Sequence, residues 1–550
     1  MRHALTLTIL SLIVQPIAEA SGAGSAALAS SQEVRIGNGP EPLSLDPARA
    51  SSVSEIRIVE NLFEGLTTLD PITMEPLPAT AESWTVSPDG HEYIFKIRKN
   101  AKWSNGDPVT AHDFVTSWTR LIEPETQSEY SYQGFRLKNG EAFNAGRIKD
   151  PRSLGVRASD DATLVVTLEN PTPYFLSLIA AKMMAPRHRS LTNEPIKKQL
   201  NDDSVLISNG AFKLASWKKG KHVKLVPNEF YWDKAKVYLK AAYLVPTSDQ
   251  DDEERAFFRG DLEETNDVPN LKVPVYKRQI QKEPGKYHPF KTTPFLGTCF
   301  LRLNVTQPPL NDKRVRKALA LTIDRDFIVS AVTIAGERPA SSFTPPNTAG
   351  YKGPGTLNPR VKPENVDKAR RLLAEAGYPS GKRFGSLVLH FDNTGNNVKL
   401  AEALSEMWRN HLGINVSLRG EDWTNYHASQ HDMTYQISRS VWIADYPDPN
   451  AFLSLFVTGG SSNKTGWGSM QYDALIKQAA RTESPDARYE ILRKSEEILL
   501  DELPILPIYT YTHKKLVSER LRLVLGDGRM VPWQSNILGT LYLKHYAIAP

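Results

Sequence analysis

Asp445 has the most unusual surroundings of the acidic residues, in the segment WIADYPDPNAFL (442–453). Large apolar and aromatic side chains flank it, and two prolines and an apolar helix start follow. A carboxylate among such neighbours costs free energy unless a cation or a hydrogen-bond donor meets it. The partner is an arginine of the protein, the start of a helix near Asn450, or a positive group of a ligand. The segment by itself leaves these three alternatives open.

Catalytic motifs do not accompany this aspartate. The sequence contains no G-x-S-x-G, no Walker loop, no Rossmann glycine pattern after a strand and no H-E-x-x-H. Asp445 and Asp448 resemble a carboxylate pair for acid–base chemistry. However, Asp448 stands between Pro447 and Pro449, and such a turn accounts for an aspartate by itself. We expect a protein that is not an enzyme.

Two histidines have a spacing that metal sites use. His427 and His431 are four residues apart, with Asp432 adjacent, so a helix would place both rings on one face. Nothing nearby completes a ligand set, and histidines on a solvated surface are the better explanation of the pattern. We expect no metal and no cofactor.

Length and charge restrict the class of protein. A chain of 550 residues predicts two or three domains. Charged residues make up 23%, and the net charge of +5 is spread over interspersed acids and bases. Nucleic-acid binding is not expected, because no basic arm or block is present.

The N-terminus has the features of a signal peptide. Arg2 and His3 precede the apolar run 4–14, and AEA (18–20) offers a cleavage point after Ala20. No later segment reaches the ~20 apolar residues that span a bilayer. Cys299 is the single cysteine, so neither an N-terminal lipid nor an intrachain disulfide is expected. We predict a periplasmic protein secreted through the Sec pathway; the alternative is a disordered or membrane-lying N-terminus.

The elements that position Asp445 follow from hydrophobic periodicity. A strand at 385–391, a helix at 397–413 ending at Gly413, and a strand at 414–418 predict a right-handed crossover between parallel strands. The first third, with short strands among turns, is more typical of α+β structure. Further expected elements are helices at 312–323 (capped by Asn311), 365–377 and 484–504, and strands at 93–98, 163–168 and 505–512.

Longer segments carry a family resemblance. AESWTVSPDGHEYIFKIRKNAKWSNGDPVTAHDFVTSW (81–118) resembles the signature of the family-5 extracellular solute-binding proteins of ABC importers. Further similar segments are 208–232, 308–329, 343–346, 442–453 and 505–517. They cover almost the whole predicted mature chain, and they resemble the oligopeptide-binding members more than the dipeptide or nickel binders.

The resemblance implies a fold and a function. The fold would be α/β and periplasmic binding protein-like (type II, cluster C), with two hinged lobes and an extra small α+β domain. The implied regions are a signal peptide (1–20), a discontinuous first domain (21–63, 187–296 and 513–550), a second domain (64–186) and a third (297–512). A monomer would capture oligopeptides between its lobes and deliver them to the permease and ATPase subunits of an importer. The alternatives are another solute (dipeptide, murein peptide or nickel chelate) and an exported hydrolase.

The resemblance also implies site residues. Asp445 would pair with the α-amino group of a peptide, and Arg439 with the terminal carboxylate of shorter peptides. The backbone at Val441 and Ile443, and that at Ser51 and Val53 opposite, would pair with an extended peptide. The other ligand-facing positions would be Trp423, Trp442, Tyr130 and Tyr511. Core packing, or a solvated charge for Arg439, is the alternative for each.

Three positions depart from the family pattern. Thr333 replaces a lysine and Asn397 replaces a histidine that serve the carboxylate of longer peptides. Arg302 stands where peptide binders have an acidic residue, so it would either supply the missing cation or favour ligands with an extra carboxylate. Peptide length and side-chain preference are therefore open.

Overall fold

The computed structural model describes residues 28–550 except 192–205, 248, 347, 394–395 and 461. The predicted signal peptide lies outside these residues. Within them, no helix has both the length and the apolar character that crossing a membrane requires.

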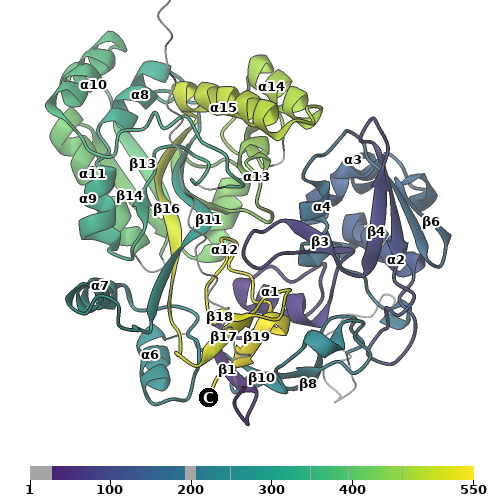
Figure 1. Ribbon diagram of the computed structural model, residues 1–550. Coiled ribbons are helices and arrows are strands. Elements are labelled where there is room, and N and C mark those ends of the chain that lie inside the picture. The colour runs from purple at the N-terminus through teal and green to yellow at the C-terminus, as the bar shows by residue number, and fades with distance from the viewer. Residues whose placement is uncertain (1–27, 192–205, 248, 347, 394–395, 461) are drawn as a thin grey trace, which may run out of the picture.

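A six-stranded sheet, in the order β12-β16-β11-β15-β13-β14, forms the frame around Asp445. Its strands are β11 (Phe290–Leu303), β12 (Arg338–Pro339), β13 (Ser386–Asp392), β14 (Asn415–Glu421), β15 (Ile437–Ile443) and β16 (Ile505–Leu516). β13 and β14 are parallel and are joined by α11 (Asn397–Leu412), which confirms the expected strand–helix–strand unit. Helices α8 to α11 lie on one side of this sheet and α13 to α15 on the other (Figure 1).

The helix boundaries follow from capping chemistry. Gly413 ends α11 in the left-handed conformation, at φ 70°, and Ser484 caps α15 through its side chain. The expected cap of α8 at Asn311 is wrong. Asp312 caps this helix, because its backbone is extended and its carboxylate accepts a hydrogen bond from the Arg314 N–H at 2.8 Å.

A four-stranded sheet, β1-β10-β9-β8, brings together distant parts of the chain. Its strands are β1 (Glu33–Gly37), β8 (Phe212–Lys218), β9 (His222–Pro227) and β10 (Ala241–Val245). A three-stranded sheet near the C-terminus contains β17 (Leu521–Val524), β18 (Met530–Pro532) and β19 (Tyr546–Ile548). The long strands β11 and β16 run from the six-stranded sheet down to this region (Figure 1).

A third group of elements contains the short strands expected in the first part of the chain. Its sheet has the order β4-β5-β7-β6, with β4 (Ala81–Val86), β5 (Glu92–Ile97), β6 (Val156–Asp160) and β7 (Thr163–Thr167). A hairpin of β2 (Thr67–Leu69) and β3 (Pro76–Pro78) lies beside it. This α+β group confirms the strands expected at 93–98 and 163–168.

The helices range from single turns to five turns. Besides α11, they are α1 (Val53–Leu62), α2 (Ala111–Ile122), α3 (Gly140–Asn144), α4 (Phe175–Leu178), α6 (Gln250–Phe258), α7 (Val273–Lys282), α8 (Lys313–Leu321), α9 (Arg325–Phe327), α10 (Pro363–Glu375), α12 (Trp423–His431), α13 (Asn450–Leu453), α14 (Met470–Ala480) and α15 (Pro485–Glu502).

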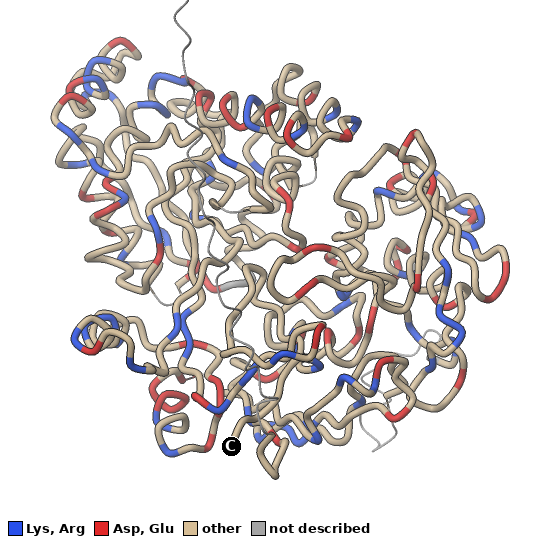
Figure 2. Tube along the Cα trace, in the orientation of Figure 1, with Lys and Arg blue, Asp and Glu red and all other residues tan. Residues whose placement is uncertain are grey.

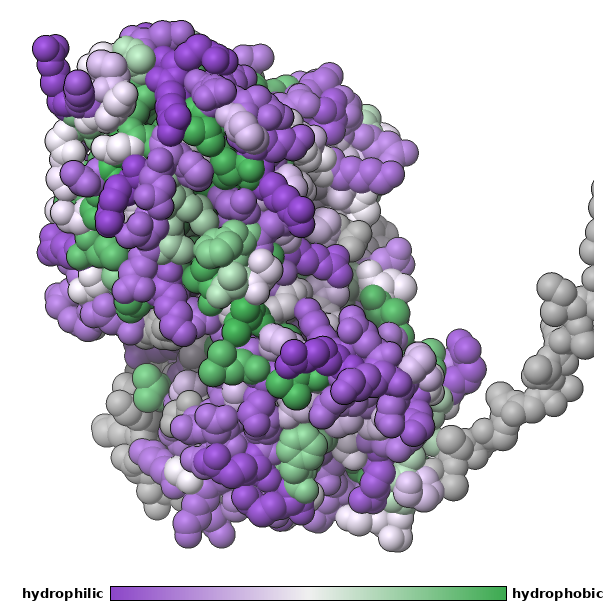
Figure 3. Space-filling view, turned by 90° about the vertical axis from the view of Figure 1, so that its left-hand side faces the viewer, coloured by the Kyte–Doolittle hydropathy of each residue, from purple (hydrophilic) through white to green (hydrophobic). Residues whose placement is uncertain are grey.

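The surface agrees with the charge pattern of the sequence. Lysines, arginines and acidic residues are interspersed along the whole trace (Figure 2). The face shown in Figure 3 is mainly hydrophilic, with hydrophobic residues in small groups between the charged ones. A continuous basic face of the kind that binds nucleic acid is not seen in these views.

Candidate functional site

Two adjoining cavities contain most of the predicted site residues. Cavity A has a volume of about 180 Å³ and is lined by Ser51, Val53, Tyr130, Ile443 and Asp445, among others. Cavity B has a volume of about 420 Å³, and its lining includes Val53, Thr333, Asn397, Arg439 and Tyr511. The residues common to both linings are Val53, Arg57, Phe295, His513 and Gly539. We call the two cavities together the cleft.

Asp445 stands at the cavity A end of the cleft, directly after β15. Its Oδ2 accepts hydrogen bonds from the Tyr132 hydroxyl at 2.8 Å and from Gln133 Nε2 at 2.7 Å. Burial raises the pKa of the Asp445 carboxyl, against the lowering effects of Tyr132, Lys182 and Gln133. The arginine partner and the helix cap considered from the sequence are not what the structure places here. The carboxylate is held in position by two neutral hydrogen-bond donors, and Lys182 is the nearby cation of the protein whose charge acts on it.

Sequence reasoning did not find Tyr132, Gln133 or Lys182. The first two lie in a 3-10 segment (Ser131–Arg136) more than 300 positions from Asp445, and no local pattern connects them to it. The Lys182 Nζ lies 4.0 Å from the centre of the Tyr130 ring, a cation–π contact. These contacts exist only because the chain brings the α+β group against the end of β15.

Arg439 lies in cavity B and already has protein partners. Its NH1 group donates to Asp392 Oδ2 at 3.1 Å, and its NH2 group donates to the Tyr511 hydroxyl at 2.8 Å. Asn397 Nδ2 donates to the other oxygen of Asp392 at 2.8 Å. The guanidinium is therefore oriented before any ligand arrives.

The two departures from the family pattern, Thr333 and Asn397, line the same cavity as Arg439. The Thr333 hydroxyl donates to Glu337 Oε2 at 2.9 Å. Neither side chain carries a charge, so neither replaces the cation that the family pattern has there.

The free edge of β15 offers backbone groups to an extended ligand. The Ala444 N–H donates to the Leu296 carbonyl at 2.9 Å. Since hydrogen-bonded pairs alternate along an antiparallel ladder, Trp442 is the next residue bonded to β11. Val441 and Ile443 then direct their N–H and C=O groups to the opposite edge. Among the described residues, β13 pairs with β15 only at Ile437 and Ser438, before this edge begins.

The segment opposite has a different backbone from the one expected for strand pairing. Val53 is the first residue of α1, and the Ser51 N–H donates to Glu55 Oε2 at 2.9 Å. Ser51 and Val53 line the cleft, but the Ser51 N–H is committed to the capping of α1. The β15 edge is the side of the cleft that has strand geometry.

Of the remaining predicted residues, Trp442 and Arg302 lie outside the linings of cavities A and B. Trp442 donates from Nε1 to the Ala451 carbonyl at 2.7 Å and lines a third cavity, of about 300 Å³, together with Asp445. Trp423 begins α12, and its side chain lies outside the described part of the chain. Arg302 is buried, with its guanidinium 5.6 Å from the Phe300 ring, and it is not among the residues lining the cleft.

Asp448 has a larger structural role than a turn requires. Its carboxylate forms two hydrogen bonds with the Arg488 guanidinium, at 2.8 and 2.6 Å, and both side chains are buried. The interpretation of Asp448 as a turn residue alone is therefore incomplete, because it anchors α15 beneath the Asp445 segment.

The histidine pair shows no metal geometry in the described residues. His431 is exposed and its Nδ1 lies 2.7 Å from Asp432 Oδ1. Within the part of the chain that the structure describes, no group of three or more His, Cys, Asp or Glu residues could hold a metal ion.

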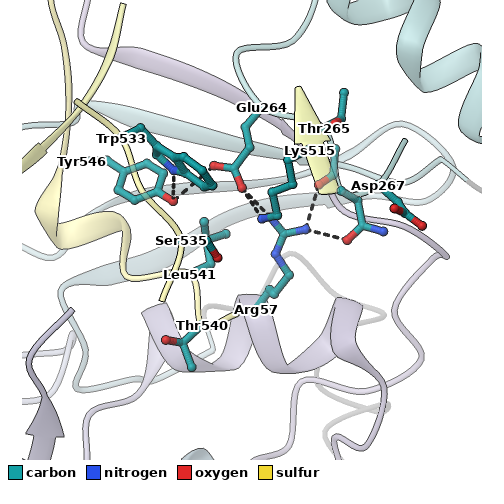
Figure 4. A network of polar contacts seen from close by, with 12 residues as sticks. Arg57, Glu264, Thr265, Asp267, Lys515, Trp533, Ser535, Thr540, Leu541 and Tyr546 are labelled. Atoms are coloured by element: carbon teal, nitrogen blue, oxygen red, sulfur yellow. Dashed lines mark hydrogen bonds and ion pairs between the residues drawn. The ribbon is translucent and has the colours of Figure 1, made fainter. Parts of the chain in front are cut away.

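A buried polar network supports the wall shared by the two cavities. Arg57 from α1 and Lys515 from β16 both point toward the Glu264 carboxylate, which also accepts a hydrogen bond from the Tyr546 hydroxyl (Figure 4). Arg57 Nε and His513 Nε2 are buried and have no hydrogen-bond partner. Buried polar atoms normally find partners, so unpaired ones along a cavity are typical of a site that receives a ligand.

Another cavity of about 440 Å³ lies between α2 and β6. Arginines and histidines line part of it, but none of the predicted site residues does. Its size does not make it the functional site, because it contains neither Asp445 nor the free edge of β15.

Comparisons with known proteins identify the family of the chain. The model of the family "Bacterial extracellular solute-binding proteins, family 5 Middle" matches residues 75–464. The periplasmic murein peptide-binding protein MppA of Escherichia coli is 33% identical and aligns over 95% of this chain and 96% of its own. The periplasmic oligopeptide-binding protein OppA of Salmonella typhimurium is 34% identical, over 89% of each chain.

Solved structures are similar over nearly the whole length. The E. coli murein tripeptide binding protein MppA superposes with a TM-score of 0.80 at 32% identity, over 95% of this chain and 99% of the other. Haemophilus influenzae OppA in complex with RPPGFSPFR gives 0.77 at 29% identity, over 95% and 100%. The substrate-binding domain of an oligopeptide ABC transporter from Bacillus anthracis gives 0.74 at 29% identity, over 95% and 100%.

Proposed function

Since this chain belongs to the family 5 bacterial extracellular solute-binding proteins and has the α/β fold of the type II periplasmic binding proteins, we propose that it captures peptides in the cleft for an ABC importer. The observation that carries the proposal is Asp445: a carboxylate held by two neutral donors, beside a free strand edge. Relatives named for oligopeptides and murein peptides support it.

The peptide would lie along the cleft in one direction. Its ammonium group would meet Asp445 in cavity A, and its backbone would pair with the edge at Val441 and Ile443. Its carboxylate would point toward Arg439 in cavity B, where a planar guanidinium suits bidentate recognition. Tyr130, Tyr511 and Trp442 would contact the ligand between or beside these ends.

The second candidate is a different solute on the same fold, and the relative named for murein peptides favours a modified peptide over a nickel chelate. Mass spectrometry of small molecules that co-purify with the protein separates these possibilities. Incubating a peptide with the protein and finding it intact would support binding rather than hydrolysis, in agreement with a family of binding proteins.

We also place the protein in the periplasm, as a monomer that delivers its ligand to permease and ATPase subunits. The periplasmic relatives and the absence, in the described residues, of a helix that could span a membrane support this location. The first domain (21–63, 187–296 and 513–550) and the third (297–512) would close on the ligand, with the second (64–186) beside them. The pairing of β1 with β10 and the passage of β11 and β16 between the sheets support this division.

Closure of the two domains on a peptide predicts a smaller radius of gyration of the protein. A saturating tripeptide should reduce the radius of gyration measured by small-angle scattering, because predicted contact residues at Ser51 and Ile443 lie on different sides of the cleft. The melting temperature should rise, because the ligand binds only the native state. An unchanged radius with a raised melting temperature would show binding without closure.

The proposed contact between Arg439 and the peptide carboxylate predicts how C-terminal amidation affects peptides of different length. Amidating the C-terminus of a tripeptide should weaken binding about 10- to 100-fold, the loss expected when a charged hydrogen bond of about 1.5–3 kcal/mol is removed. The same change in a pentapeptide should matter less, because Thr333 and Asn397 offer it no charge. Calorimetry on the tripeptide and the pentapeptide, each with a free and an amidated C-terminus, measures these losses. Equal losses at both lengths would exclude Arg439 as a length-specific anchor.

A further inference from the structure

Besides Arg57, which is paired with Glu264 (NH2 to Oε1, 3.4 Å), cavity A contains two charged side chains that the proposed peptide contacts do not use. Glu60 extends from α1, and Lys182 extends from a 3-10 turn (Lys182–Met184); both line the cavity together with Asp445. Glu60 Oε2 is buried without a hydrogen-bond partner. Lys182 is only 5% exposed, and its charge acts on both carboxylates.

The ionisation of Glu60 that makes cavity A electrically neutral differs between the ligand-free and the ligand-bound protein. Without a ligand, ionised Asp445 and Lys182 compensate each other, and Glu60 is most stable when protonated because a second buried anion would be unpaired. A ligand ammonium adds a second positive charge to a largely apolar cavity. Ionising Glu60 restores neutrality.

We propose that Glu60 loses a proton when an ammonium group binds at Asp445, and that Lys182 then serves as the counter-charge of Glu60. The O–H bond of the Glu60 carboxyl breaks, its proton passes to a buffer base, and the electron pair remains on the carboxylate. One positive charge enters the cavity and one leaves. This inference rests on the proposed peptide-binding function and names the residues that set its charge and pH requirements.

The surrounding groups support this exchange. Burial raises the pKa of Glu60 to about 7, against the lowering effects of Lys182, of a hydrogen bond from the Leu541 backbone and of Arg57. Burial lowers the pKa of Lys182 to about 8, although Asp445, Glu60, Glu55 and Glu129 all raise it. Tyr542, in the C-terminal segment, lines the same cavity; burial raises its pKa, and Glu60 adds to the effect. Glu60 is therefore protonated below neutral pH without ligand, and a nearby ammonium lowers its pKa.

The sign of the pH dependence follows. Below about pH 7 the proton on Glu60 must be released before the charges balance, so peptide affinity should rise with pH, by at most about tenfold per unit. The rise should level off above pH 7. It should reverse above the α-amino pKa of the peptide, about 7.7–8.0, because the ligand then loses its own charge.

Calorimetry with trialanine at pH 6, in two buffers of different ionisation enthalpy, measures the proton directly. We expect a release approaching one proton per peptide bound. Glu60→Gln, which imitates the protonated acid, should abolish the release, bind like the parent at pH 5, and bind at least about tenfold more weakly at pH 7.5. N-acetyl-trialanine is the matched ligand control, because without an ammonium it should release no proton from either protein.

Lys182→Met tests the second half of the inference. Added to Glu60→Gln, it removes the surplus positive charge and should restore affinity at pH 7.5 to within about threefold of the parent. Proton release that persists in Glu60→Gln, or trialanine binding by the parent without release, would overturn the inference while leaving the proposed function intact. Failure of every free peptide to bind at any pH would overturn both.

Discussion

Asp445→Asn should abolish most peptide binding while leaving the fold intact. The asparagine side chain can still accept the hydrogen bonds from Tyr132 and Gln133, so the segment keeps its place. What it loses is the negative charge, and a ligand ammonium would then be enclosed without a counter-ion. Removing one partner of a buried pair costs about 3–5 kcal/mol. That corresponds to a loss of about a hundred- to several-thousand-fold in affinity, measured by calorimetry with a tripeptide.

The ligand-free variant provides an internal check. Because the pKa of Asp445 is raised in the folded protein, its ionised form destabilises the native state above the unfolded pKa of the group. Asp445→Asn removes that cost at pH 7. The melting temperature without ligand should therefore be equal to that of the parent or higher, which distinguishes lost binding from lost folding.

Modifying the ligand completes the test. N-acetylation removes the ammonium, so its effect on the parent should match that of Asp445→Asn, and the two changes together should cost no more than either alone. Parent protein that binds N-acetyl peptides as tightly as free ones would show that Asp445 has another partner. The peptide-ammonium assignment would then be wrong.

Asp448→Ala should produce a large loss of stability without a direct loss of a ligand contact. The substitution leaves the Arg488 guanidinium buried, with its two hydrogen bonds to Asp448 gone. Breaking a buried ion pair from one side costs about 3–5 kcal/mol in the free energy of unfolding. Chemical denaturation of the ligand-free protein measures it.

Arg488→Met in the Asp448→Ala background is the matched control. It removes the unpaired charge and should recover part of the stability, whereas a simple loss of packing would grow worse. A change in stability below about 1 kcal/mol for Asp448→Ala alone would mean that the pair contributes like an exposed salt bridge. Asp448 would then have only the turn role inferred from its flanking prolines.

Local order in this protein follows from local sequence. The helix at 397–413 is amphipathic, with Leu400, Leu404 and Trp408 on one face, and Gly413 supplies the left-handed residue that ends it. The strands before and after this helix, β13 and β14, pair in parallel, because a helix of this length returns the chain to the same end of the sheet. The cap at Asp312 was missed because two adjacent polar residues are both suitable, and only the backbone angles choose between them.

Some features of the site were likewise predictable from the sequence, and others were not. The sequence alone marked Asp445 as a carboxylate in need of a partner, because its neighbours in the chain are apolar. The family resemblance also implied that Arg439, Thr333 and Asn397 stand where the carboxylate of a peptide would lie, and in the structure all three line cavity B.

The tertiary structure alone decided what surrounds these groups. Tyr132 and Gln133 reach Asp445 from the 3-10 segment Ser131–Arg136, and Arg488 reaches Asp448 from α15. Glu60 and Lys182 line cavity A from separate segments. These contacts join residues far apart in the sequence, so no periodic pattern or motif spacing predicts them. Burial and charge depend on distances through space, so the ionisation of the cavity becomes visible only after the distant segments have packed together.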